Sequence, residues 1–300
     1  MSAALVWDSE IASVVERLTK ASIDDYYNPY RAFDWPESIP SGSLWMSSSL
    51  MTVHGSKAAA SLSEEQLREL SRWESIHFYS LNVHGIRELL MEVVRRIHTP
   101  GFEVPTPFFH HFLGEENEHM WFFAEFCLRY GGKLYADRAL PFSEREQSPL
   151  LDSFLVFSRI LIFEQIVDYY NSTMAADEQL PEVIRAINRV HHQDESRHIA
   201  FGCQLVRALY ANLKKHGDQD ELAFAKDYLQ RYLNTSLAKL YSVDVYRDAG
   251  IPDPYGFRAA LLADPARLPE HDRITARTRA FYRRIGVFSD QPASRGTTTA

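Results

Sequence analysis

Two glutamate–histidine pairs with the same spacing limit the folds open to this chain. Glu116 is followed three residues later by His119, and Glu195 by His198, 79 residues further along. In a helix this spacing places a carboxylate and an imidazole on one face, about one turn apart. A single pair is usually a surface contact. Two such pairs, joined by carboxylates from two further helices, are how a helical bundle holds two metal ions in its core.

The pattern of apolar residues and helix boundaries predicts a helical protein. A capping box at residues 63–66 and glycines at 131 and 132 mark helix ends. We expect helices over residues 1–20, 63–98, 106–130, 149–176, 181–215, 218–246 and 265–285, with an irregular stretch at 26–60 and a loop at 252–256. The fold class is therefore all-α, a ferritin-like helical bundle with accessory helices. Residues 1–62 would form an N-terminal wrapping segment, residues 63–288 the diiron bundle and residues 289–300 a flexible tail.

Composition and charge exclude several classes of partner. The formal charge is −8 and no long basic run is present, so we expect neither nucleic acid nor a membrane as a partner. The most apolar stretch, residues 154–163, is interrupted by Arg159 and is far shorter than the ~20 residues of a membrane span. No charged-then-apolar leader opens the chain, and Cys127 and Cys203 lie in apolar surroundings. These features predict a cytoplasmic protein with reduced cysteines.

Glu164 lies in the most apolar helical sequence of the chain. Residues 154–167 are apolar on nearly every side, which predicts a helix that is buried all round. A buried carboxylate is costly unless it is paired or bound to a metal. A salt bridge to Arg159 or to another buried base is the alternative. We favour metal ligation, because Glu164 lies between the two Glu-x-x-His helices, where a bundle of this type needs a carboxylate.

His191 extends the second pair into a longer stripe. His191, Glu195 and His198 follow one another at i, i+4 and i+7 on one helix face, whereas His192 points about 100° away. Asp194 and Arg197 flank this stripe and are placed to hydrogen-bond the ligands from outside. A solvated polar face is the alternative, but the apolar residues 199–201 follow directly and favour burial.

The fourth carboxylate is ambiguous between Glu74, Glu88 and Glu92. Glu88 lies about ten residues before one helix end, and Glu116 about ten after the next helix start, so the two are level in an antiparallel pair. Glu74 would lie roughly 20 Å further along the axis. Helical phase counts against Glu88, because the apolar stripe of its helix faces elsewhere. We give more weight to the position along the bundle axis and choose Glu88 as the fourth carboxylate.

The donor types favour iron or manganese. Carboxylate oxygens mixed with imidazoles, without thiolates, suit these metals better than structural zinc. No zinc-protease motif, Gly-rich phosphate loop or nucleophile elbow is present.

At these residues the chain resembles the p-aminobenzoate N-oxygenase (AurF-like) family of non-haem diiron oxygenases. The resemblance covers roughly residues 65–245, and the histidine one turn before the last Glu-x-x-His is its distinctive part. It implies two iron ions, with manganese as an alternative, and O₂ as co-substrate. The metal ligands are then Glu88, Glu116, His119, Glu164, His191, Glu195 and His198. It also implies N-oxygenation of a small amine in a biosynthetic pathway, with electrons from a reductase or ferredoxin; a homodimer is compatible with the sequence.

Three other functions remain open from the sequence. The first is C–H hydroxylation or desaturation of a small acid at the same centre. The second is iron handling by a ferritin-like protein without an organic substrate. The third is an all-α interaction protein in which the carboxylates and histidines are coincidental. Metal analysis separates the third from the others.

Overall fold

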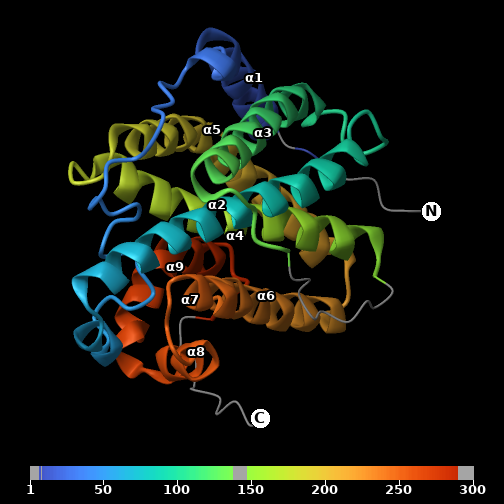
Figure 1. Cartoon of the computed structure of the whole chain (residues 1–300). Coiled ribbons are helices and arrows are strands. Elements are labelled where there is room, and N and C mark those ends of the chain that lie inside the picture. The colour runs from blue at the N-terminus through green and yellow to red at the C-terminus, as the bar shows by residue number, and fades with distance from the viewer. Residues whose placement is uncertain (1–6, 8, 138–146, 290–300) are drawn as a thin grey trace.

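The described part of the chain is helical. The computed structural model describes residue 7, residues 9–137 and residues 147–289, and within these ranges no strand occurs (Figure 1). The predicted all-α bundle with accessory helices is confirmed. Most of the predicted tail, residues 290–300, lies outside the described residues, as do most of the first eight residues.

Five long helices and four shorter ones follow one another along these ranges. Their bounds are α1 Ser9–Asp24, α2 Glu64–Val94, α3 Thr106–Phe126, α4 Pro149–Ala176, α5 Glu182–His216, α6 Gln219–Lys239, α7 Val243–Asp248, α8 Pro254–Ala263 and α9 Leu268–Arg284. Short 3₁₀ turns lie at Pro29–Arg31, Lys57–Ser61 and Pro265–Arg267, and a π-helical turn at Cys127–Gly131 extends α3.

The structure differs from the sequence prediction near the C-terminus. The helix expected over residues 218–246 is two helices, α6 and α7, which are separated near Ser242. The expected loop at 252–256 instead contains the start of α8. There the Asp253 side chain accepts a hydrogen bond from the backbone N–H of Gly256 at 2.9 Å, and Pro254 occupies the first helical position. Aspartate followed by proline is a favourable helix start, which the loop prediction overlooked.

Two antiparallel helix pairs form the bundle. The first pair is α2 with α3, and the second is α4 with α5. The ring of Tyr79 on α2 stacks on Phe123 of α3 with 5.1 Å between centroids. Across the pairs, α2 approaches α4 so closely that a Cβ atom at Gly85 would lie 2.5 Å from the Phe163 ring. A side chain at position 85 would therefore displace the Phe163 ring, and glycine lets this ring pack directly on α2.

The N-terminal segment covers the outside of the bundle. Helix α1 packs against α3 and α5, with Ile11, Val15 and Leu18 buried. Residues 46–53 bring further apolar side chains against the core. Helix α4 is buried on nearly every side, as its composition predicted. Cys127 and Cys203 form no disulfide. Among the described residues, every helix is too short or too polar to span a bilayer.

Candidate metal centre

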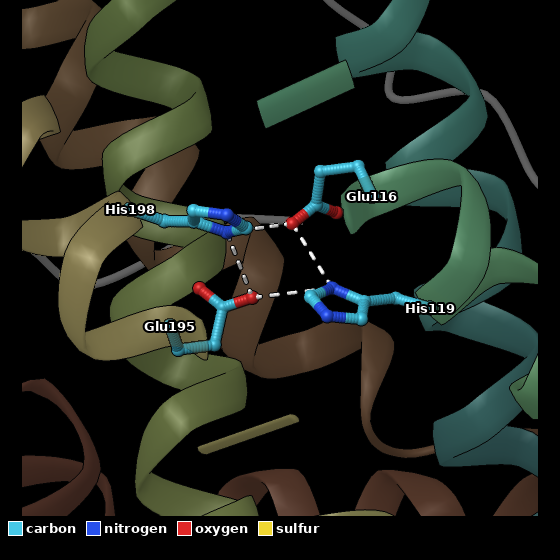
Figure 2. Close-up of side chains that lie close together, drawn as sticks. All are labelled: Glu116, His119, Glu195 and His198. Atoms are coloured by element: carbon cyan, nitrogen blue, oxygen red, sulfur yellow. Dashed lines mark hydrogen bonds and ion pairs between the residues drawn. The ribbon is translucent and has the colours of Figure 1, made fainter. Parts of the chain in front are cut away.

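The two Glu-x-x-His pairs meet in the middle of the bundle. Figure 2 shows Glu116 and His119 from α3 pointing toward Glu195 and His198 from α5. One ligand atom from each of the four side chains lies within 4.8 Å of all the others, and all four side chains are buried. The Glu116 Oε1 atom is 3.2 Å from His119 Nδ1 and 2.8 Å from His198 Nδ1. The helical spacing therefore places both pairs on the faces that α3 and α5 turn toward each other.

Glu164 and His191 lie beside these four residues. His191 Nε2 is 3.2 Å from Glu195 Oε1, and its side chain is only 2% exposed. Glu164 on α4 is buried and interacts with both Glu195 and Glu116. The structure therefore brings together six of the seven predicted site residues, three carboxylates and three imidazoles, from α3, α4 and α5.

A second layer of carboxylates holds the histidine rings from outside. His119 Nε2 lies 3.0 Å from Asp194 Oδ2, and His198 Nε2 lies 2.7 Å from Glu115 Oε2. Each ring therefore uses Nε2 for an outer carboxylate and turns Nδ1 toward the cluster centre. A metal-binding histidine typically has such a partner, which fixes its tautomer and orientation.

Arg197 joins the two outer carboxylates. Its guanidinium donates to Asp194 Oδ1 at 2.5 Å and to Glu115 Oε1 at 2.9 Å. The N-terminal segment completes this layer, because Arg197 also donates to Asp25 and the Tyr27 hydroxyl donates to Asp194. The flanking roles expected for Asp194 and Arg197 agree with these contacts. Glu115 takes its outer position because it is about 100° from its neighbour Glu116 on the helix. Tyr27 was missed, because nothing local to it indicates a contact 167 residues away.

His191 is held differently from the other two rings. Its Nδ1 contacts the side-chain amide nitrogen of Asn171, and the amide oxygen of Asn171 has no hydrogen-bond partner. Turning this amide by 180° lets the oxygen accept a hydrogen bond from Nδ1 and leaves Nε2 free as a ligand atom. His192, by contrast, is partly exposed and bonds Asp168 away from the cluster, as its helical phase predicted.

Several buried polar atoms of the cluster make no hydrogen bond. They are one oxygen each of Glu116 and Glu164, both oxygens of Glu195, Nε2 of His191 and Nδ1 of His198. Buried polar atoms without partners are rare in native proteins, and each costs about 1–3 kcal/mol. Their concentration at one point, with oxygen and nitrogen donors and without thiolates, fits a centre for iron or manganese.

Burial and neighbouring charges shift the pKa values of the clustered side chains. Burial raises the pKa of Glu164 well above its usual range, and the charges of Glu195 and Glu116 raise it further. Burial lowers the pKa of His119, but Glu116 and Asp194 outweigh it and raise that pKa to about 10. Burial also lowers the pKa of His191, with the neighbouring His119 adding to the effect. Divalent cations at this point would replace the protons that these groups otherwise carry.

Glu88 does not belong to this cluster, and its choice from the sequence is wrong. Its side chain is 57% exposed and pairs with Arg87 at 3.1 Å. Depth along the axis was the wrong criterion, because it takes no account of which side of the helix faces the site. The alternatives also lie elsewhere: Glu92 pairs with Arg96, and buried Glu74 accepts hydrogen bonds from Thr52.

Helix α2 instead presents Asn82 near the level of the cluster. Asn82 is one turn beyond Tyr79, which packs on Phe123, itself about one turn from His119. The Asn82 side chain is fully buried; its amide donates to the Phe78 carbonyl at 2.8 Å, and its oxygen has no partner. The search of the sequence for a fourth carboxylate could not find it, because asparagine is not acidic.

Comparison with known proteins points to one family. The model of the family described as P-aminobenzoate N-oxygenase AurF matches residues 8–286. This match extends over the whole bundle and includes the N-terminal segment and α9. No individual curated protein matches the chain.

Proposed function

Because the chain belongs to the p-aminobenzoate N-oxygenase AurF family, we propose that it is an O₂-dependent non-haem diiron monooxygenase that oxygenates the nitrogen of a small amine. The observation that carries this proposal is the buried group of three glutamates and three histidines with unpaired donor atoms. Two iron ions are the proposed cofactor, and manganese fits the same donors.

We propose the following ligand roles at this centre. Glu116, Glu164 and Glu195 supply negatively charged oxygens, and the three histidines supply neutral nitrogens. Asn82 supplies a neutral carboxamide oxygen in place of the carboxylate expected from the fourth helix; it is supported by its burial, its level and its unpaired oxygen. When bound, a reduced pair of iron ions supplies electrons and Lewis acidity for the activation of O₂.

The protein around the cluster excludes water and fixes the ligands. Phe112 packs on the His198 ring and Phe123 on the His191 ring, with centroids 4.6 Å and 4.8 Å apart. Asp194 and Glu115 hold the Nε2 atoms of His119 and His198, so the rings are oriented before a metal arrives. Preorganised ligands in a dry site are what oxygen chemistry at a metal requires of the protein.

The proposed reaction needs a source of electrons. Conversion of an amine to a hydroxylamine takes up O₂, two electrons and two protons, places one oxygen atom on nitrogen and releases the other as water. The amine supplies neither electron, so we propose an external donor such as a reductase or ferredoxin. Further rounds would give the nitroso and nitro products. The net charge of −8 agrees with partners other than nucleic acid.

The proposal is tested with reduced, iron-loaded protein, ¹⁸O₂ and a panel of aryl and alkyl amines, with products identified by mass spectrometry. We expect label on nitrogen in at least one product. Glu195→Gln should abolish the product, whereas the exposed Glu88→Gln serves as the matched control and should retain it. Iron binding without any oxygenated amine would contradict the proposal. Label on carbon would instead indicate a hydroxylase, and iron oxidation without a labelled organic product an iron-handling protein.

A further inference from the structure

A small apolar cavity lies directly against the candidate metal centre. Its walls come from α2, α3, α4 and α5, and Glu164 and His198 are its only ionisable lining residues. The remaining lining is apolar, with Phe109, Phe157, Leu161 and Phe201 among it. The cavity therefore opens onto one edge of the cluster and is otherwise bounded by hydrocarbon.

The size of the cavity limits what it can hold. Its volume is about 20 Å³. A cavity needs about 10–15 Å³ to hold one water molecule, and a cavity that binds benzene measures about 150 Å³. The space beside Glu164 thus suits a molecule of one or two heavy atoms and is far too small for an aryl amine.

The polarity of the lining disfavours water as the occupant. A buried water typically needs two to four hydrogen-bond partners. The Nε2 atom of His198 already bonds Glu115 at 2.7 Å, and its Nδ1 atom faces Glu116 at 2.8 Å without a hydrogen bond. Among the lining residues, only this Nδ1 atom and one oxygen of Glu164 are unpaired. A water here would have at most these two partners in an otherwise apolar space, whereas an apolar diatomic molecule gains by leaving bulk water for such a space.

We infer that this cavity is the docking site for dioxygen beside the metal centre, separate from the space that the organic substrate occupies. The inference rests on the proposed oxygenase function, because that function makes O₂ a substrate. The cavity holds O₂ against Glu164 and His198 and keeps out larger molecules.

Substitution by a larger residue at either of two lining positions would fill the cavity. Gly202 lines it, and a Cβ atom there would lie 3.2 Å from Leu161 Cδ1, so Gly202→Ala presses on another lining side chain. Val93 lines it from α2 and is 1% exposed, and Val93→Leu adds a methylene. Val206→Leu is the matched control, since Val206 is equally buried on α5 but does not line the cavity.

The test uses xenon, which reports small apolar cavities without any chemistry. Crystals of the metal-free full chain are pressurised with xenon, and its position is found by anomalous scattering. We expect xenon between Phe157, Leu161 and Phe201 in the wild type and in Val206→Leu, and its loss in Gly202→Ala and Val93→Leu. An ordered, hydrogen-bonded water in this cavity, or no xenon in the wild-type protein, would overturn the inference.

A kinetic measurement adds a second readout. The reduced iron-loaded protein is mixed with increasing O₂ in stopped flow. The two filled variants should need a several-fold higher O₂ concentration for half-maximal oxidation while keeping the maximal rate, and Val206→Leu should behave as wild type. Unchanged O₂ dependence in variants that have lost xenon would contradict a docking role. Because xenon binding requires neither iron nor an amine, a failed amine assay leaves this result standing and refutes only the proposed function.

Discussion

Replacing Glu74 by glutamine tests whether its carboxyl group has a structural role or binds a metal ion. Glu74 is the only buried acidic residue of α2, and it was one of three candidates for the fourth carboxylate. Its oxygens accept hydrogen bonds from Thr52, whose hydroxyl also bonds the Tyr246 hydroxyl at 2.9 Å. Burial raises its pKa to about 7, against the lowering effects of Thr52 and Arg267. Glutamine keeps the shape and cannot ionise.

The sign and size of the effect follow from this pKa. In the unfolded chain the carboxyl group loses its proton above its ordinary pKa of 4.5, whereas in the folded protein it keeps the proton up to about pH 7. Glu74 therefore contributes stability below pH 4.5 that is lost as the pH rises through 7. The full contribution is about 3 kcal/mol, of which about 2.5 kcal/mol lies between pH 5 and pH 8.

The assay is denaturant unfolding of the metal-free wild type and Glu74→Gln at pH 8 and pH 5. The free energy of unfolding of the wild type, relative to the variant, should rise by about 2.5 kcal/mol on acidification. The comparison with the variant removes the titration of all other groups. Parallel pH curves for the two proteins would refute the reasoning. The variant should also bind as much iron as the wild type; loss of iron would return Glu74 to the ligand set.

Three further predictions concern the centre and its surroundings. Glu88→Gln should leave the bound metal unchanged in elemental analysis, because its side chain is exposed and paired with Arg87; metal loss would contradict its placement. Arg197→Leu should lower the free energy of unfolding by about 3–5 kcal/mol in denaturant melts, because it leaves Glu115 and Asp194 buried without their cation; an unchanged midpoint would show that this layer is not structural. Asn82→Leu should lower metal affinity in a chelator competition while the circular dichroism spectrum stays helical, and unaltered affinity would remove the Asn82 oxygen from the proposed ligand set.

Much of the site could be predicted because its signals are local. The spacing within each Glu-x-x-His pair fixes a helix face, and the apolar run around Glu164 fixes its burial. The His191 stripe needed only the period of one helix. The sequence of each of the helices α3, α4 and α5 shows by itself which sides of that helix are buried. The inward position of these residues could therefore be predicted helix by helix.

The contribution of α2 could not be predicted in the same way. This helix carries buried polar residues on more than one side, such as Glu74, His77 and Asn82, so its sequence does not identify one inward face. Depth along the axis favoured Glu88, an exposed residue, and the buried amide of Asn82 lies six residues before it, about 9 Å away along the axis. Contacts from Asp25 and Tyr27 to the outer layer depend on a long-range fold of the N-terminal segment, for which no local pattern exists.

We propose that six side chains from α3, α4 and α5 hold a pair of metal ions. The most direct test is the metal content of the purified protein, measured by elemental analysis together with anomalous scattering from its crystals at the iron edge. We expect two iron or manganese ions per chain, with both anomalous peaks among Glu116, His119, Glu164, His191, Glu195 and His198. Protein that binds neither metal when these are supplied, or peaks that lie elsewhere, would contradict it.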